Sequence, residues 1–110
     1  MKVQIGVTDY DMTLVSNETI ALEFEQAEDD VSIVGGFVYP LFNQIKINKT
    51  LPTQGRIQTF LHEATHAMLD EIGQEELYHD EAFVNAMSKQ IYGLFKNNNF
   101  EKIYKFLGDK

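Results

Sequence analysis

The sequence predicts an α+β fold, in which an N-terminal antiparallel β-sheet packs on a long helix and a second long helix lies toward the C-terminus. Two observations carry this prediction. Short stretches in the first half of the chain alternate polar and apolar residues, as strands with one buried face do. In the second half, apolar residues recur at helical spacing over 54–72 and again from about residue 80. With 110 residues, 44% of them hydrophobic, the chain is expected to form one domain, 1–110.

Composition excludes several classes of site and partner. The chain has no cysteine, so a disulfide or thiolate site is excluded and a transition metal has to be held by His, Asp or Glu. Nine basic and seventeen acidic residues give a formal charge of −8, which repels phosphate backbones, so we expect no nucleic-acid partner. The sequence shows neither a signal peptide nor a membrane-spanning stretch, and we therefore expect a cytoplasmic protein with no membrane partner.

The first expected elements are strands at 2–8 and 11–15, joined by a tight turn at 9–11 as a β-hairpin. The segment 17–29 is ambiguous. Its apolar residues alternate as in a strand, whereas its many glutamates and a capping residue at Ser16 or Asn17 favour a helix. We expect strand or irregular structure as far as about residue 24.

A second β-rich stretch covers 31–39 and contains Gly35-Gly36, which predicts either a bulge or the close approach of another backbone. A turn at 40–43 leads into a strand at 44–48. This strand directly precedes the long helix and is a candidate edge strand that pairs with an extended substrate. The alternative is a plain strand of the sheet with no role in binding.

The long helix is expected over 54–72, with Thr53 as its N-cap and Gly73 as the residue that ends it. After a short connection at 74–79, the second long helix begins near Asp80, with Asp80 or His79 as its cap. A polar break precedes a short terminal helix at 100–107. The apolar stripe of that terminal helix consists of Phe100, Ile103, Tyr104 and Leu107.

The long helix contains the pattern His62-Glu63-x-x-His66, which suggests a metal site. Residues four apart lie on one face of a helix, so the two imidazoles can bind a single Zn²⁺. Glu63 then lies beside the metal, where it can take a proton from a metal-bound water. The competing interpretation is a solvated polar helix face without a metal. The apolar positions around the motif place the histidines at the border of a buried stripe, which favours the metal site.

A catalytic zinc needs a third protein ligand, and the candidates are His79, Asp80 and Glu81 at the start of the second long helix. We favour Glu81 because it heads the buried stripe of that helix and would face the first helix. Asp80 points about 100° away around the helix and is better suited to capping.

Three further residues have candidate secondary roles. His79 is either a metal ligand, a group that stabilises a developing oxyanion, or a surface residue without a role. Tyr78 either stabilises the oxyanion through its phenol or packs at the turn. Asp70 can accept the second N–H of a zinc-bound imidazole, although it can equally be an exposed helix carboxylate.

The order of these features resembles a known class of proteins. The β-rich first half, the strand at 45–47, Leu51-Pro52, the His62–His66 motif and Asp80-Glu81-x-x-Val84 resemble small phage- and prophage-borne zinc metallopeptidase-like proteins. Their pattern is related to the ImmA/IrrE-type peptidases and more distantly to the SprT-like ones. The resemblance covers about residues 33–95.

The resemblance implies a small zincin-like domain with Zn²⁺ on His62, His66 and Glu81 and with Glu63 as general base. The expected function is hydrolysis of a protein or peptide substrate. Two alternatives stay open: a binding or regulatory protein that keeps the metal site without turnover, and a metal-free packing module. The sequence is shorter than the ImmA/IrrE-type peptidases, so the resemblance bears on the fold and the metal site more than on any substrate.

Overall fold

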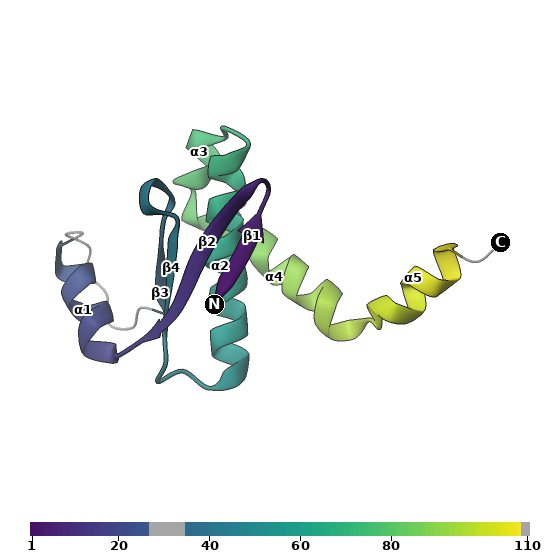
Figure 1. The fold of residues 1–110 in the computed structure, drawn as a ribbon, viewed down its shortest axis with the longest axis horizontal. Helices are drawn as coiled ribbons and strands as arrows, with labels where there is room; N and C mark the ends of the chain where they lie inside the picture. Colours follow the sequence, from purple (N-terminus) through teal and green to yellow (C-terminus); the bar gives the residue numbers. More distant parts are fainter. Residues whose placement is uncertain (27–34, 109–110) are drawn as a thin grey trace.

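A four-stranded sheet and one long helix packed on it form the centre of the α+β fold in the computed structural model (Figure 1), which describes residues 1–26 and 35–108. The strands are β1 (Lys2–Ile5), β2 (Thr8–Val15), β3 (Gly36–Tyr39) and β4 (Gln44–Asn48). The helices are α1 (Asn17–Gln26), the 3-10 turn η1 (Pro40–Phe42), α2 (Thr53–Glu71), α3 (Glu75–Tyr78), α4 (Glu81–Asn97) and α5 (Phe100–Gly108).

The sheet is mixed, with the order β1-β2-β4-β3. Strands β1 and β2 are antiparallel, as are β3 and β4, but β2 and β4 run parallel. The prediction of a wholly antiparallel sheet is therefore wrong at its centre, because β3 returns the chain to the starting end of β2 before β4 begins. The prediction that 44–48 is an edge strand is also wrong, because β4 is paired on both sides. Its Ile45 and Ile47 are 0% and 1% exposed.

The first hairpin turns earlier than predicted. Ile5 pairs with Thr8, so the loop is Gly6-Val7 and not 9–11. Gly6 has φ of 62°, a conformation that a residue without Cβ adopts readily, and glycine is favoured at this position of two-residue loops. Within β2, Tyr10 is buried between exposed neighbours, which is the alternation of a strand and not the pattern of a turn.

The segment that follows β2 is a helix, so the prediction of strand or irregular structure as far as about residue 24 is wrong. Ser16 caps α1, since its Oγ accepts a hydrogen bond from the Thr19 amide at 3.2 Å and its carbonyl accepts one from Ile20 at 3.1 Å. Ile20 is 2% exposed whereas Leu22 is 61% exposed, so the alternating apolar residues do not share one buried face. The predictions that fall on 27–34 lie outside the described residues.

Helix α2 covers the sheet through small residues. Ala64 and Ala67, which are 2% and 0% exposed, let the helix approach Ile45, Ile47 and the ring of Tyr10 closely. The helix begins one residue earlier than predicted: Pro52 is the N-cap and not Thr53, because the Pro52 carbonyl accepts the first helical hydrogen bond from Arg56 at 2.9 Å.

The glycine pair before β3 allows a close approach, one of its two predicted roles. A Cβ on Gly36 would collide with the backbone carbonyl of Lys46 on β4. A Cβ on Gly35 would lie 2.5 Å from the Thr59 hydroxyl on α2, so the start of β3 is pressed against both the sheet and the helix.

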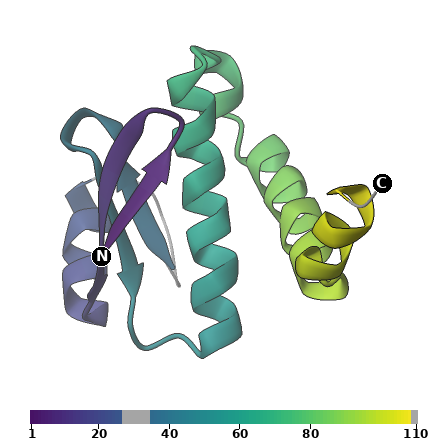
Figure 2. The same cartoon turned by 45° about the vertical axis from the view of Figure 1, so that its right-hand side comes forward.

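Helices α4 and α5 lie on the side of α2 away from the sheet (Figure 2). Helix α4 packs on α2, and α5 projects from the end of α4, so the molecule measures 54 × 32 × 26 Å along its principal axes (Figure 1). Within the described residues, no helix combines the length and the apolar character needed to cross a membrane.

Candidate metal centre

Helix α2 presents two imidazoles on one face. His62 and His66 are separated by one helical turn, and their ring centroids are 5.0 Å apart with an interplanar angle of 67°. The side chain of His66 is 9% exposed and that of His62 is 20% exposed. Both rings therefore lie at the border of the packed face, as the apolar stripe of α2 predicts.

The chain reverses after α2 through a glycine turn that brings α4 back to these histidines. Gly73 has φ of 74°, its amide donates to Asp70 at 3.0 Å, and the Gln74 amide donates to Leu69 at 2.9 Å. These two bonds form a Schellman motif, which ends a helix and turns the chain. The single turn α3 follows. Asp80 then caps α4, since its Oδ1 accepts a hydrogen bond from the Phe83 amide at 3.0 Å.

Glu81, the first residue of α4, completes a cluster with the two histidines. Its Oε2 lies 3.0 Å from His62 Nε2 and its Oε1 lies 2.8 Å from His66 Nε2. Among residues 1–26 and 35–108, His62, His66 and Glu81 are the one group of three whose ligand atoms all lie within 4.8 Å of one another. This group could hold a metal ion.

The other nitrogen of His66 has a defined partner. His66 Nδ1 lies 2.7 Å from the carbonyl oxygen of Tyr78 in α3, and a carbonyl can only accept, so Nδ1 carries the proton. In the neutral ring Nε2 is then the lone-pair nitrogen, and it faces Glu81. Burial, the largest influence, lowers the pKa of His66 although Glu81 acts in the opposite direction, so the ring is uncharged at neutral pH. A lone pair against a carboxylate oxygen is a donor set that suits a bound cation.

Glu63 lies one residue from His62 and is buried, with 8% of its surface exposed. Burial, and to a smaller extent the charge of Glu81, raises the pKa of Glu63 to about 8. A carboxyl group with a pKa in this range can both take and return a proton near neutral pH.

The structure also places the residues with candidate secondary roles. The ring of Tyr78 contacts the rings of His66 and His79 edge to face, at centroid distances of 5.0 and 4.9 Å. Burial and the charge of Asp70 raise the pKa of Tyr78 to about 12, so the phenol keeps its proton at neutral pH. His79 is the exposed C-cap of α3 and Asp80 caps α4; neither belongs to the cluster described above.

The partner of the second ring nitrogen of His66 differs from the prediction. The acceptor for the second N–H of His66 is the Tyr78 carbonyl and not the carboxylate of Asp70. This role belongs to a backbone atom, which no sequence pattern reveals. The one sequence feature related to this contact is the length of the segment 74–80, which allows a single helical turn between Gly73 and the cap of α4.

No family model matches the sequence, and neither a curated protein nor a solved structure is significantly similar to the chain.

Proposed function

We propose that this protein is a zinc-dependent peptidase whose metal is held by His62, His66 and Glu81. The observation that carries the proposal is the convergence of two imidazole nitrogens and one carboxylate on a single point, with their ligand atoms within 4.8 Å of one another. Two histidines and one glutamate are the ligand set of a catalytic zinc that keeps a position open for water. The resemblance of the sequence pattern to the ImmA/IrrE-type and SprT-like peptidases points in the same direction.

The residues present fit Zn²⁺ for two chemical reasons. In the absence of cysteine, nitrogen and oxygen donors favour zinc in a catalytic site over a closed structural one. His66 is also held in the tautomer a metal ligand needs, since its Nδ1–H is donated to a carbonyl at 2.7 Å.

When bound, Zn²⁺ would supply a water of lowered pKa and would polarise a peptide carbonyl. Glu63, which is adjacent in sequence to His62, would take the proton of that water and pass it to the leaving amine. The phenol of Tyr78 keeps its proton at neutral pH, so it can donate a hydrogen bond to the oxyanion that forms.

The test has two parts, metal content and hydrolysis. Protein purified without chelators should contain about one zinc per chain, and His62→Ala and Glu81→Ala should lose it. His79→Ala and Glu76→Ala are matched controls because they replace an exposed histidine and an exposed glutamate near the cluster, and they should keep the metal.

Hydrolysis is measured on a peptide library and on an unfolded protein that carries self-quenched fluorescent labels, so that cleavage raises the fluorescence. Glu63→Gln should keep the metal and lower the rate of cleavage by roughly two to four orders of magnitude, the usual range for loss of a general base. Bound zinc without cleavage that depends on Glu63 would exclude the peptidase and favour a metal-containing binding protein. A wild-type chain that takes up no metal would exclude both.

A further inference from the structure

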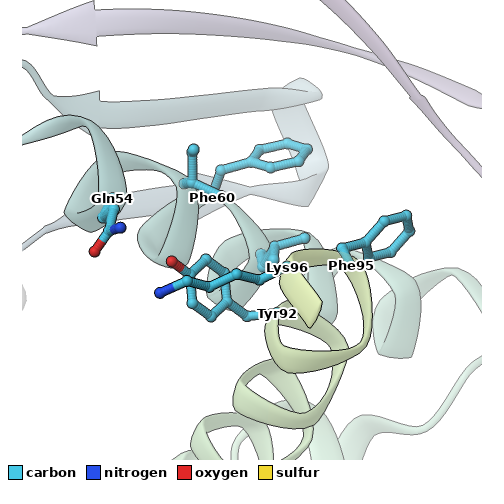
Figure 3. Close-up of a pocket in the computed structure, with 7 residues that line it drawn as sticks. Gln54, Phe60, Tyr92, Phe95 and Lys96 are labelled. Atoms are coloured by element: carbon cyan, nitrogen blue, oxygen red, sulfur yellow. The ribbon is translucent and has the colours of Figure 1, made fainter. Parts of the chain in front are cut away.

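An apolar cavity of about 550 Å³ lies between the first half of α2 and the last turns of α4 (Figure 3). Figure 3 shows Gln54 and Phe60 on the α2 side and Tyr92, Phe95 and Lys96 on the α4 side. Ile57 and Leu61 complete the lining, and Ile57 is 46% exposed. Phe95 is 57% exposed as well, so this cavity is open to a group from outside the molecule.

Helix α5 presents a second unpaired apolar surface. Its stripe residues Phe100, Ile103, Tyr104 and Leu107 are 39%, 36%, 81% and 74% exposed, and Phe106 beside them is 80% exposed. Charged residues lie on the opposite face, where Lys105 pairs with Glu101 at 3.2 Å. A helix with this pattern normally buries its apolar stripe.

The junction between α4 and α5 holds the first residue of α5 against Phe95 at the rim of the cavity and directs the rest of the helix away from it. The rings of Phe95 and Phe100 are stacked with centroids 4.6 Å apart, and the Asn98 side chain donates to the Leu94 carbonyl at 2.9 Å. Asn99 caps α5, since its Oδ1 accepts from the Lys102 amide at 3.1 Å. With this junction in place, α5 projects away from the body (Figures 1 and 2).

We propose that α5 of one chain occupies the α2–α4 cavity of a second copy and that the exchange is reciprocal, giving a symmetric dimer. Each chain then supplies one apolar helix and one apolar cavity, so a closed two-fold assembly satisfies both. This proposal is independent of the metal centre.

Two quantities favour a second copy as the occupant. At ~200 Å² for a large side chain, the exposed apolar residues of α5 offer roughly 600 Å² per copy, and two copies reach the lower limit of a stable interface at about 1,200 Å². The formal charge of the chain is −8, which disfavours an anionic membrane as the occupant.

Sedimentation velocity of the full chain over a wide concentration range tests the assembly. The wild type should sediment as a dimer, and Leu107→Glu on α5 or Ile57→Glu in the cavity should raise the dissociation constant roughly tenfold or more, since each buries a charge. Leu41→Glu, which replaces an apolar residue that is 85% exposed on η1, is the matched control and should leave the dimer unchanged. A wild-type monomer at all concentrations would overturn the proposal.

Crosslinking tests the arrangement, because the chain has no native cysteine. Ile57→Cys and Leu107→Cys chains are mixed and treated with a short bis-maleimide. The expected product joins one chain of each kind. A single chain that carries both cysteines is treated in the same way. If its crosslink forms only within one chain, and the mixed chains give no product, α5 closes on its own body and the proposal is overturned. A monomer that sediments with phosphatidylglycerol vesicles and is released by Leu107→Glu would overturn it too.

Discussion

His66 donates a hydrogen bond from its Nδ1 to the carbonyl oxygen of Tyr78 at 2.7 Å. This contact joins the middle of α2 to the last residue of α3, three residues before Glu81. It fixes the ring orientation of His66 and leaves Nε2 as the nitrogen that faces the cluster. The path of the backbone after α2 therefore determines both the protonation of one imidazole and the position of the carboxylate opposite it.

Gly73→Ala should destabilise the protein by about 1–2 kcal/mol, because an L-residue is strained in the left-handed conformation that Gly73 adopts at φ of 74°. A Cβ at this position meets nothing within 4 Å, so steric collision does not contribute. The same change should weaken zinc binding, since it disturbs the turn that places Tyr78 and Glu81. Urea unfolding and zinc titration measure the two effects.

Gly93→Ala is the control for that experiment. Its Cβ would meet only the Asn97 side chain at 3.8 Å in a helical position, so it should stabilise the protein by up to about 1 kcal/mol. Equal losses of stability for both variants would contradict the role assigned to the left-handed turn.

Zinc should stabilise the folded chain, because the unfolded chain does not hold His62, His66 and Glu81 together. At a free zinc concentration 100-fold above the dissociation constant, the gain is about 2.7 kcal/mol, or a rise in Tm of roughly 10 °C. Differential scanning calorimetry with zinc and with EDTA measures it. Glu81→Ala should abolish the rise, whereas His79→Ala should retain it; a zinc-dependent rise that survives Glu81→Ala would place the metal elsewhere.

The end of α2 holds the first hairpin through Glu71. Its carboxylate accepts hydrogen bonds from the Val7 amide at 3.2 Å and from the Thr8 hydroxyl at 3.0 Å. Glu71→Ala should cost about 1–2 kcal/mol of stability and Thr8→Val about 1 kcal/mol. Because the two residues share one bond, the double variant should lose less than the sum, as measured by urea unfolding of all four chains. Strict additivity would mean that the hydroxyl bond contributes nothing.

Alkaline pH should destabilise the protein through Tyr10. Burial, followed by the charges of Asp70 and Glu71, raises the pKa of Tyr10 above its ordinary value of 10.0. The phenol therefore contributes stability that is fully present below pH 10.0 and is lost as the pH rises through the higher pKa of the folded state. Tyr10→Phe should show a smaller loss of stability across this range in urea unfolding.

Tyr104→Phe in a Leu107→Glu chain provides the matched control for the pH experiment, since that side chain is 81% exposed in the single chain. It should follow the pH dependence of the Leu107→Glu parent. If Tyr10→Phe likewise follows the wild type, the alkaline transition has another origin.

Local signals predicted the second half of the chain well. The long helix expected at 54–72 is α2 at 53–71, its end at Gly73 is confirmed, and the predicted cap Asp80 opens α4. Each of these features depends on residues within one or two turns of one another, so the sequence carries them directly. The position of Glu81 opposite the histidines follows from the same turn.

The first half was predicted less well, because its arrangement depends on distant partners. Asp9 and Asp11 are typical turn residues, but the burial of Tyr10 between them requires the sheet and α2. The apolar residues of α1 alternate, and the Ser16 cap decides in favour of the helix. The enclosed position of β4 depends on its parallel pairing with β2, which no local pattern encodes.

Folding of this chain has to join two local hairpins across a long connection. Strands β1 and β2 meet through a two-residue loop, and β3 and β4 meet around η1, so each pair can form early. The parallel contact of β2 with β4 pairs residues 33 positions apart, from Asp11–Gln44 to Val15–Asn48. The entropic cost of closing that loop has to be overcome before the contact can stabilise the chain. The rate-limiting step of folding should therefore be the docking of the two hairpins, and substitutions at Ile45 should slow refolding more than substitutions near the first turn.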